Sequence, residues 1–165
     1  HNSLILATRS QPSSLQASIQ SALQDCRRQT RSLIEGVTCE VLRSQAHPDF
    51  SPVGWHLGHI AYTESLWIAG HLARSSHSSQ PDLSQPYDQL FSADGLPKAQ
   101  RQHLPETTEI LAYMDRVRSH TLKYLNDNAQ TLADTLRLWH WLIQHEAQHA
   151  ETIAMVLALH PLRPT

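Results

Sequence analysis

The sequence has 165 residues, which is enough for one domain with a single buried core, and we expect that domain to span residues 1–165. Apolar residues make up 40% of the chain and charged residues 17%, as is typical of a folded globular protein. Thirteen basic and fifteen acidic side chains leave a net charge of −2, and no apolar run approaches the roughly 18 residues of a membrane span. The composition therefore excludes nucleic acid and membranes as expected partners.

The cysteine and histidine contents differ sharply. The two cysteines, Cys26 and Cys39, together with the absence of a signal-like apolar start, predict reduced thiols in a reducing compartment, so the expected localisation is cytoplasmic. The count that stands out is twelve histidines, against only these two cysteines.

Apolar periodicity predicts two helices in the first half of the chain. The first begins after Pro12, Ser13 and Ser14 and ends near Gly36. The second begins with Ser51 as N-cap and Pro52 at the first helical position, and runs to about Ala73. Its expected core stripe consists of Trp55, His59, Tyr62, Leu66 and Ala69.

Residues 74–104 are rich in Ser, Gln, Pro and Asp and predict a long crossover with one short turn near residues 87–91. A connection of this length is often functional. A third helix is expected from Pro105 to residues 126–128, and a fourth from Thr131 to Leu159, before Pro161. No period-2 pattern indicates a strand. The expected fold is all-α: a four-helix bundle with a long crossover between helices two and three.

Two histidines of the fourth helix have the spacing of a metal site. His145 and His149 lie four residues apart, which places both imidazoles on one helix face with Cβ atoms about 5 to 6 Å apart. Either His59 or His56 in the second helix supplies a third ligand. Because unpaired imidazoles are costly to bury, we predict a shared divalent metal ion, with affinity falling near pH 6.5 as protons compete for the ligands. The fourth helix's expected core stripe is Leu138, Leu142, His145, His149, Thr152 and Val156.

Competing interpretations of these residues are weaker. A single histidine on an apolar face is usually a core residue bonded to a carbonyl, but a pair at this spacing favours metal. The string from His145 to His149 matches the HExxH protease pattern with Glu146 as general base, yet Thr152 and Met155 replace the Gly and third His of the longer version. The tryptophans are expected in the core (Trp55, Trp67, Trp139 and Trp141), and six histidines at the surface (His71, His77, His103, His120, His140 and His160).

Two segments carry a resemblance to a known family. Residues 51–67 resemble the first metal-ligand segment of the DinB-like four-helix metalloproteins, and residues 145–152 resemble the second. The chain is also similar to the N-terminal domain of the iron-dependent sulfoxide synthases of ergothioneine and ovothiol synthesis, over about residues 10–160, including residues 86–91 and 104–113. This resemblance implies that the metal ligands are His59, His145 and His149, and so favours His59 over His56.

The resemblance also implies a choice of functions. The synthases pair this bundle with a larger domain that supplies substrate contacts and a catalytic tyrosine, which we expect this chain to lack. Single-domain relatives include metal-dependent thiol transferases, often dimeric. The leading prediction is therefore a metal-dependent enzyme of thiol chemistry that acts on a small-molecule thiol as a homodimer, with Fe(II), Zn or Ni as the ion. The alternatives are a partner subunit of a split sulfoxide synthase and a non-catalytic metal-binding bundle.

Overall fold

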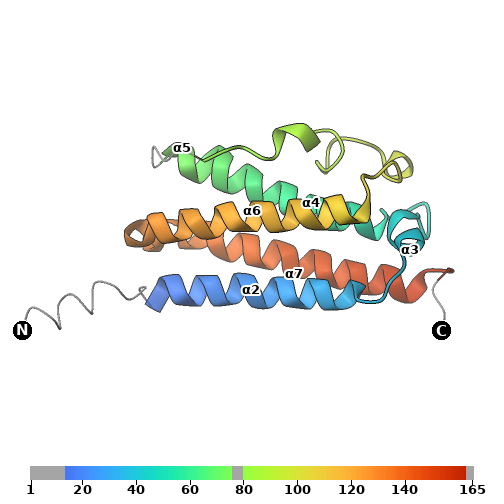
Figure 1. Cartoon of the computed structure of the whole chain (residues 1–165), viewed down its shortest axis with the longest axis horizontal. Helices are drawn as coiled ribbons and strands as arrows, with labels where there is room; N and C mark the ends of the chain where they lie inside the picture. Colours follow the sequence, from blue (N-terminus) through green and yellow to red (C-terminus); the bar gives the residue numbers. More distant parts are fainter. Residues whose placement is uncertain (1–13, 76–79, 163–165) are drawn as a thin grey trace, which may run out of the picture.

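The computed structural model describes residues 14–75 and 80–162, which are helical or irregular and contain no strand. Four long helices lie side by side (Figure 1): α2 (Ser14–Ile34), α4 (Val53–Trp67), α6 (Thr107–Asp127) and α7 (Leu136–Leu159). Around the bundle α2 packs on α7, α7 on α4 and α4 on α6, while α6 and α2 are the most loosely packed neighbours. The predicted all-α bundle with a crossover is confirmed. No described helix combines the length and the apolar character of a membrane span.

The boundaries of the helices differ from the expected ones in small ways. The prediction that Ser51 caps the second helix was wrong by one residue: Pro52 is the N-cap, and the Ser51 hydroxyl instead accepts a hydrogen bond of 2.9 Å from Arg101 Nη1. After Trp67 the helix continues through a π-helical turn, Ile68–Leu72, into the short α5, Ala73–Ser75. Pro12, Ser13 and His77 lie outside the described residues.

Two short elements were not expected from the sequence. The helix α3 (Cys39–Arg43) is capped by Thr38, whose side chain accepts from the Val41 amide. A 3-10 helix, Ala129–Thr135, occupies the start of the predicted fourth helix and leads directly into α7. Neither element is long enough to give a recognisable apolar period.

The crossover packs along one face of α4. It contains two 3-10 turns, Gln85–Tyr87 and Lys98–Gln100, rather than the single turn expected. Its backbone and side chains bond to residues spaced by seven and three along α4, which share one helix face: Trp55 Nε1 donates to Leu90 O (2.6 Å), Tyr62 Oη donates to Asp88 Oδ1 (2.9 Å), and Leu83 N donates to Ser65 Oγ (3.0 Å).

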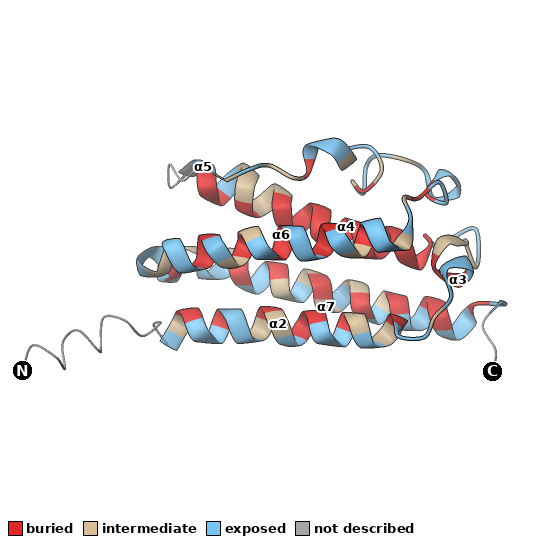
Figure 2. Cartoon of the chain, viewed as in Figure 1, coloured by how far each residue is buried: buried red, intermediate tan, exposed pale blue. Residues whose placement is uncertain are grey.

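The face of α4 predicted to point into the bundle therefore meets the crossover instead. With the bundle on one side and the crossover on the other, α4 is buried all round from Val53 to Ser65 (Figure 2). This coverage explains why α4 lacks an amphipathic sequence pattern, since a helix that is covered on all sides has no solvent face to keep polar.

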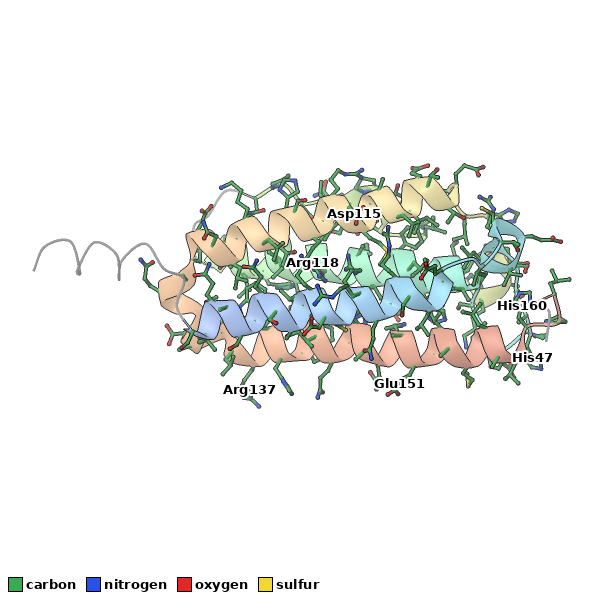
Figure 3. The ribbon with its side chains drawn as sticks, turned by 60° about the horizontal axis from the view of Figure 1, so that its bottom comes forward. His47, Asp115, Arg118, Arg137, Glu151 and His160 are labelled. Atoms are coloured by element: carbon green, nitrogen blue, oxygen red, sulfur yellow. The ribbon has the colours of Figure 1, made fainter. Side chains whose placement is uncertain are left out.

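A cluster of four buried charged side chains joins the four long helices. We call it the charge cluster; its members, one from each long helix, are Arg27, Glu64, Arg118 and Glu146. Arg27 donates from Nε and Nη2 to the two carboxylate oxygens of Glu146 (3.0 and 3.1 Å), and Arg118 donates likewise to Glu64 (3.1 and 2.9 Å). Arg118 Nη2 also donates to Glu146 (3.3 Å). Figure 3 places Arg118 between α6 and α2.

The charge cluster is neutral and its carboxylates are fully hydrogen-bonded. Thr30 Oγ1 donates to Glu146 (2.8 Å), and Thr121 Oγ1 donates to Glu64 (2.7 Å). Burial by itself would raise the pKa of Glu64, but the charge and hydrogen bonds of Arg118 outweigh it and hold that pKa below its ordinary value. Removal of one member would leave an uncompensated buried charge, which typically costs about 3–5 kcal/mol. The charge cluster therefore ties α2 and α6 to α4 and α7.

The close approach of the crossover to α4 depends on Gly58. A Cβ at this position would lie 2.1 Å from Cζ of the fully buried Phe91. We therefore expect Gly58→Ala to displace the crossover and to lower the free energy of unfolding by about 1–3 kcal/mol, despite the better helix propensity of alanine. Urea denaturation followed by circular dichroism measures this change.

Gly70 offers the matched control. Among the described residues, a Cβ there would meet only Leu66 Cδ1, at 3.9 Å, so Gly70→Ala should leave the stability unchanged or raise it slightly. Equal stabilities of the two variants would contradict the proposed packing of Phe91 on Gly58.

Candidate metal centre

Three histidines from two helices meet on the side of the bundle between α4 and α7. His59 on α4 and His145 and His149 on α7 each direct a ring nitrogen to one point, and these nitrogens all lie within 4.8 Å of one another. His59 is buried, while His145 and His149 are partly exposed. The three residues predicted as ligands are therefore brought together, at a place where one ion can reach all three.

The tautomer of His59 follows from its partner. Its Nδ1 lies 2.7 Å from the carbonyl oxygen of Phe91, and because a carbonyl only accepts, Nδ1 carries the proton. Neutral His59 therefore presents an unprotonated Nε2, which lies 3.2 Å from Nε2 of His145. Two nitrogens bound to one ion at about 2.1 Å, with an angle between about 90° and 109°, would be separated by about 3.0–3.4 Å. The observed spacing fits shared coordination.

His56 lies against His149 and outside the converging set. The two Nδ1 atoms are 2.9 Å apart, and His56 is 7% exposed. His56 was the alternative third ligand in the sequence, but it is not a member of the converging set. It contacts one of the candidate ligands instead.

Aromatic rings hold two of the imidazoles from behind. Trp55 stacks on His59 with ring centroids 4.7 Å apart and planes at 11°. The guanidinium of Arg101 lies over the Trp55 ring, 4.0 Å from its centroid. Trp141 stacks on His145 at 5.1 Å and 20°. The prediction that all four tryptophans lie in the core was wrong for Trp141, which is 42% exposed and covers the outer side of His145.

The buried stripe of α7 is rotated from the predicted one by one residue. The core positions include Trp139, Leu142, Glu146, Ala150 and Ile153, whereas Leu138 and Thr152 are only partly buried. Glu146, rather than either histidine, occupies the centre of the bundle, because Arg27 and Arg118 neutralise it there. The histidines are displaced to the edge of the core, where an ion remains accessible. Glu146 is thus engaged in the charge cluster and is not free as the general base of a protease.

The charge cluster was not predicted from the sequence, although the sequence contains a signal for it. Arg27 lies among the core residues Leu23, Cys26 and Thr30 of α2, and Arg118 among Met114, Val117 and Thr121 of α6. Basic residues at core spacing on two helices, with acidic residues at core spacing on the other two, indicate buried ion pairs.

The expectation for the remaining histidines was correct in part. His71, His103 and His140 are exposed, and His120 is half-buried. His160 is buried, contrary to the prediction, because its Nε2 lies 2.9 Å from Ser44 Oγ and its Nδ1 accepts from the Leu162 amide (3.2 Å). It closes the end of α7 against the segment after α3.

Burial keeps the imidazoles of the centre neutral. Desolvation, followed by the neighbouring imidazoles, lowers the pKa of His145 from 6.5 to about 4 and lowers that of His149 further. Desolvation also lowers the pKa of His56 to about 4 and that of His59 below its ordinary value. Neutral imidazole is the form that binds metal, so this environment favours ligation over protonation.

Two hollows of the surface differ in their position relative to the candidate centre. One of about 310 Å³ is lined by Trp141, Gln144, His145, Ala147, Gln148 and Glu151 and opens beside the candidate centre on the outer side of α7. Glu151 projects outward there (Figure 3). A larger one, of about 810 Å³, lies between α2 and α6, on the opposite seam of the bundle, and none of the converging histidines lines it.

Comparison with known proteins agrees with this architecture. Residues 22–153 match the model of the DinB superfamily. The chain is 36% identical over 145 residues to a protein named hercynine oxygenase from Mycolicibacterium thermoresistibile, covering 86% of this chain and 31% of that protein. It is 33% identical over 138 residues to the hercynine oxygenase of Mycolicibacterium smegmatis, covering 81% and 30%.

A third relative gives the same result. The hercynine oxygenase of Mycobacterium tuberculosis is 34% identical over 118 residues, which cover 70% of this chain and 26% of the relative. The chain thus spans less than a third of the length of these relatives. Since the family model covers the bundle from α2 to α7, including every candidate ligand, this chain belongs to the DinB superfamily.

Proposed function

We propose that this chain is the metal-binding portion of an oxygenase of the hercynine oxygenase type, in which His59, His145 and His149 hold an Fe(II) ion. The observation that carries the proposal is the convergence of three neutral imidazoles within 4.8 Å. The chain that holds them is 36% identical to such an enzyme over 86% of its own length. Three protein ligands leave coordination positions open, as catalytic metal sites require.

The metal ion and the protein would contribute differently to the reaction. When bound, the ion supplies open coordination positions and lowers the pKa of a thiol held there. The chain's own residues orient and protect the ligands: Phe91 O fixes the tautomer of His59, and Trp55 and Trp141 fix the planes of His59 and His145. The charge cluster sets the rotation of α7 that brings His145 and His149 to the edge of the core.

Among the described residues, few groups are available to contact a second substrate. The described part of the crossover is bonded along α4 through Leu83, Asp88 and Leu90, so these residues are not free to cap the histidines. We therefore propose that substrate contacts come from a region equivalent to the relatives' unmatched two-thirds. The free-standing thiol transferase favoured on sequence, its homodimer, and Zn or Ni as the ion stay predictions, and the identity to hercynine oxygenases supports the oxygenase instead.

The ligand assignment predicts the effect of single substitutions. His59→Ala, His145→Ala and His149→Ala should each abolish tight binding of one ion per chain, because two imidazoles do not fix the ion. Elemental analysis after anaerobic reloading with Fe(II) measures the stoichiometry. His103→Ala, which removes an exposed histidine, is the control and should retain full occupancy. Retention of metal by His59→Ala, together with its loss in His56→Ala, would overturn the assignment.

The lowered pKa values predict the pH dependence of binding. Protons compete with the metal only below the ligand pKa in the folded protein, so affinity should change little as pH falls through 6.5 and should decrease on approach to about 4, the pKa of His145. The expected loss thus lies below the value inferred from the sequence. Chelator competition at a series of pH values measures it, and a midpoint at 6.5 would contradict it.

Folding must be monitored in the same pH series. In the unfolded chain these histidines take up protons near 6.5, whereas in the folded chain they stay neutral to lower pH. The contribution of these neutral histidines to the stability of the metal-free protein is therefore fully present above pH 6.5 and decreases as the pH falls from 6.5 to about 4. Circular dichroism at each pH separates loss of affinity from loss of fold.

The oxygenase proposal predicts where activity will be found. The purified chain with Fe(II), oxygen, hercynine and a cysteine-containing thiol should form no sulfoxide at a useful rate, because the second substrate is not held at attack distance. Addition of a polypeptide equivalent to the relatives' unmatched region should restore carbon–sulfur bond formation, detected by mass spectrometry. Sulfoxide made by the chain alone would refute the need for that region. Thiol transfer to a test electrophile, with no sulfoxide in either mixture, would favour the transferase.

A further inference from the structure

We infer that His56 is a positioning residue for the candidate metal centre: it accepts the Nδ1–H of His149 and thereby leaves Nε2 of His149 free for the ion. This inference rests on the proposed metal-binding function. The observation behind it is the distance of 2.9 Å between Nδ1 of His56 and Nδ1 of His149. No sequence pattern indicates this role, because His56 and its partner His149 are 93 positions apart in the chain.

The geometry restricts the tautomers of the pair. Only one proton can lie between two Nδ1 atoms at this distance, so one ring donates and the other accepts. If His56 donated, neutral His149 would carry its proton on Nε2, and that nitrogen would have no lone pair for metal. Coordination through Nε2 therefore requires His149 to donate and His56 to carry its own proton on Nε2.

His59 provides an internal precedent for this arrangement. Its Nδ1–H is held by the carbonyl oxygen of Phe91, which leaves Nε2 to face His145. His59 and His149 thus each have an outer hydrogen-bond partner at Nδ1, one from the crossover and one from α4. Such outer partners fix the ring orientation of metal-binding histidines and raise their basicity, and their loss typically weakens metal affinity about 10- to 100-fold.

The position of His56 makes the bond rigid. His56 lies one turn before His59 on α4, is 7% exposed, and packs edge-on against Trp55 with ring centroids 5.3 Å apart. Two residues of one buried helix thereby contribute to the same centre: His59 as a candidate ligand, and His56 as the hydrogen-bond partner of a candidate ligand on α7. The hydrogen bond also links α4 and α7 at the centre itself.

Two substitutions with the same branching at Cγ separate this role from a packing role. In His56→Asn the amide oxygen takes the place of Nδ1 and can accept from His149, whereas in His56→Leu a methyl group takes that place. We expect His56→Leu to bind one Zn(II) or Co(II) ion per chain, about 10- to 100-fold more weakly than the unsubstituted chain. We expect His56→Asn to recover most of the affinity. His140→Leu, which removes an exposed histidine of α7, is the control and should not change it.

The readouts distinguish every outcome. Chelator competition gives affinity, the Co(II) absorption spectrum reports ligand number, and long-range proton–nitrogen NMR of the Zn(II) form reports tautomers, with His56 expected as the Nε2–H form. Equal affinity for His56→Leu and the unsubstituted chain, or an Nδ1–H tautomer at His56, would overturn the inference. A Co(II) spectrum of His56→Leu that showed one imidazole ligand fewer would also overturn it, because His56 would then be a ligand.

If the unsubstituted chain bound no metal, the proposed function would fail and this role with it. If His56→Leu did not fold, the tautomer and His56→Asn would still decide.

Discussion

The neutral cluster of Arg27, Glu64, Arg118 and Glu146 is the interaction on which the rest of this structure depends. Each member comes from a different long helix, and all four side chains are at most 9% exposed. Buried ion pairs contribute little net stability compared with apolar packing, but they tolerate only one arrangement, because a rotated helix would leave a charge unpaired. The cluster therefore specifies how the four helices are rotated, more than how strongly they adhere.

That rotation determines the geometry of the candidate metal centre. Glu146 follows His145 in the chain, so drawing Glu146 to the centre of the bundle turns His145 and His149 toward the seam with α4. On α4, Glu64 is held by Arg118, and His59 lies on the side covered by the crossover. The histidines are consequently desolvated enough to stay neutral and exposed enough for an ion to reach them.

The crossover contributes to the centre without closing it. Its carbonyl oxygens at Leu90 and Phe91 accept from Trp55 and His59, so it acts as a rigid outer layer of α4. On the other side of the centre, Trp141 and the hollow beside His145 remain open. This division between a covered side and an open side fits the proposal that substrate contacts come from a region beyond the bundle.

The sequence by itself determined the helices and the local pair of histidines. A 3.6-residue apolar period is a property of neighbouring residues, and the spacing of His145 and His149 fixes their common face wherever the helix packs. The resemblance to DinB-like proteins added His59. Tertiary structure decided which face of each helix is buried: Leu138 and Trp139 are both apolar, so the pattern allowed two rotations that differ by one residue, or about 100°.

Only the fold could choose between those rotations, because the deciding interactions join residues far apart in the chain. Arg27 and Glu146 are separated by 119 positions, and His56 and His149 by 93. Hydrogen bonding of a buried charge or of an imidazole depends on the position of its partner in space, which local periodicity does not contain. For that reason the candidate ligands could be named from the sequence, while the residues that hydrogen-bond to them could not.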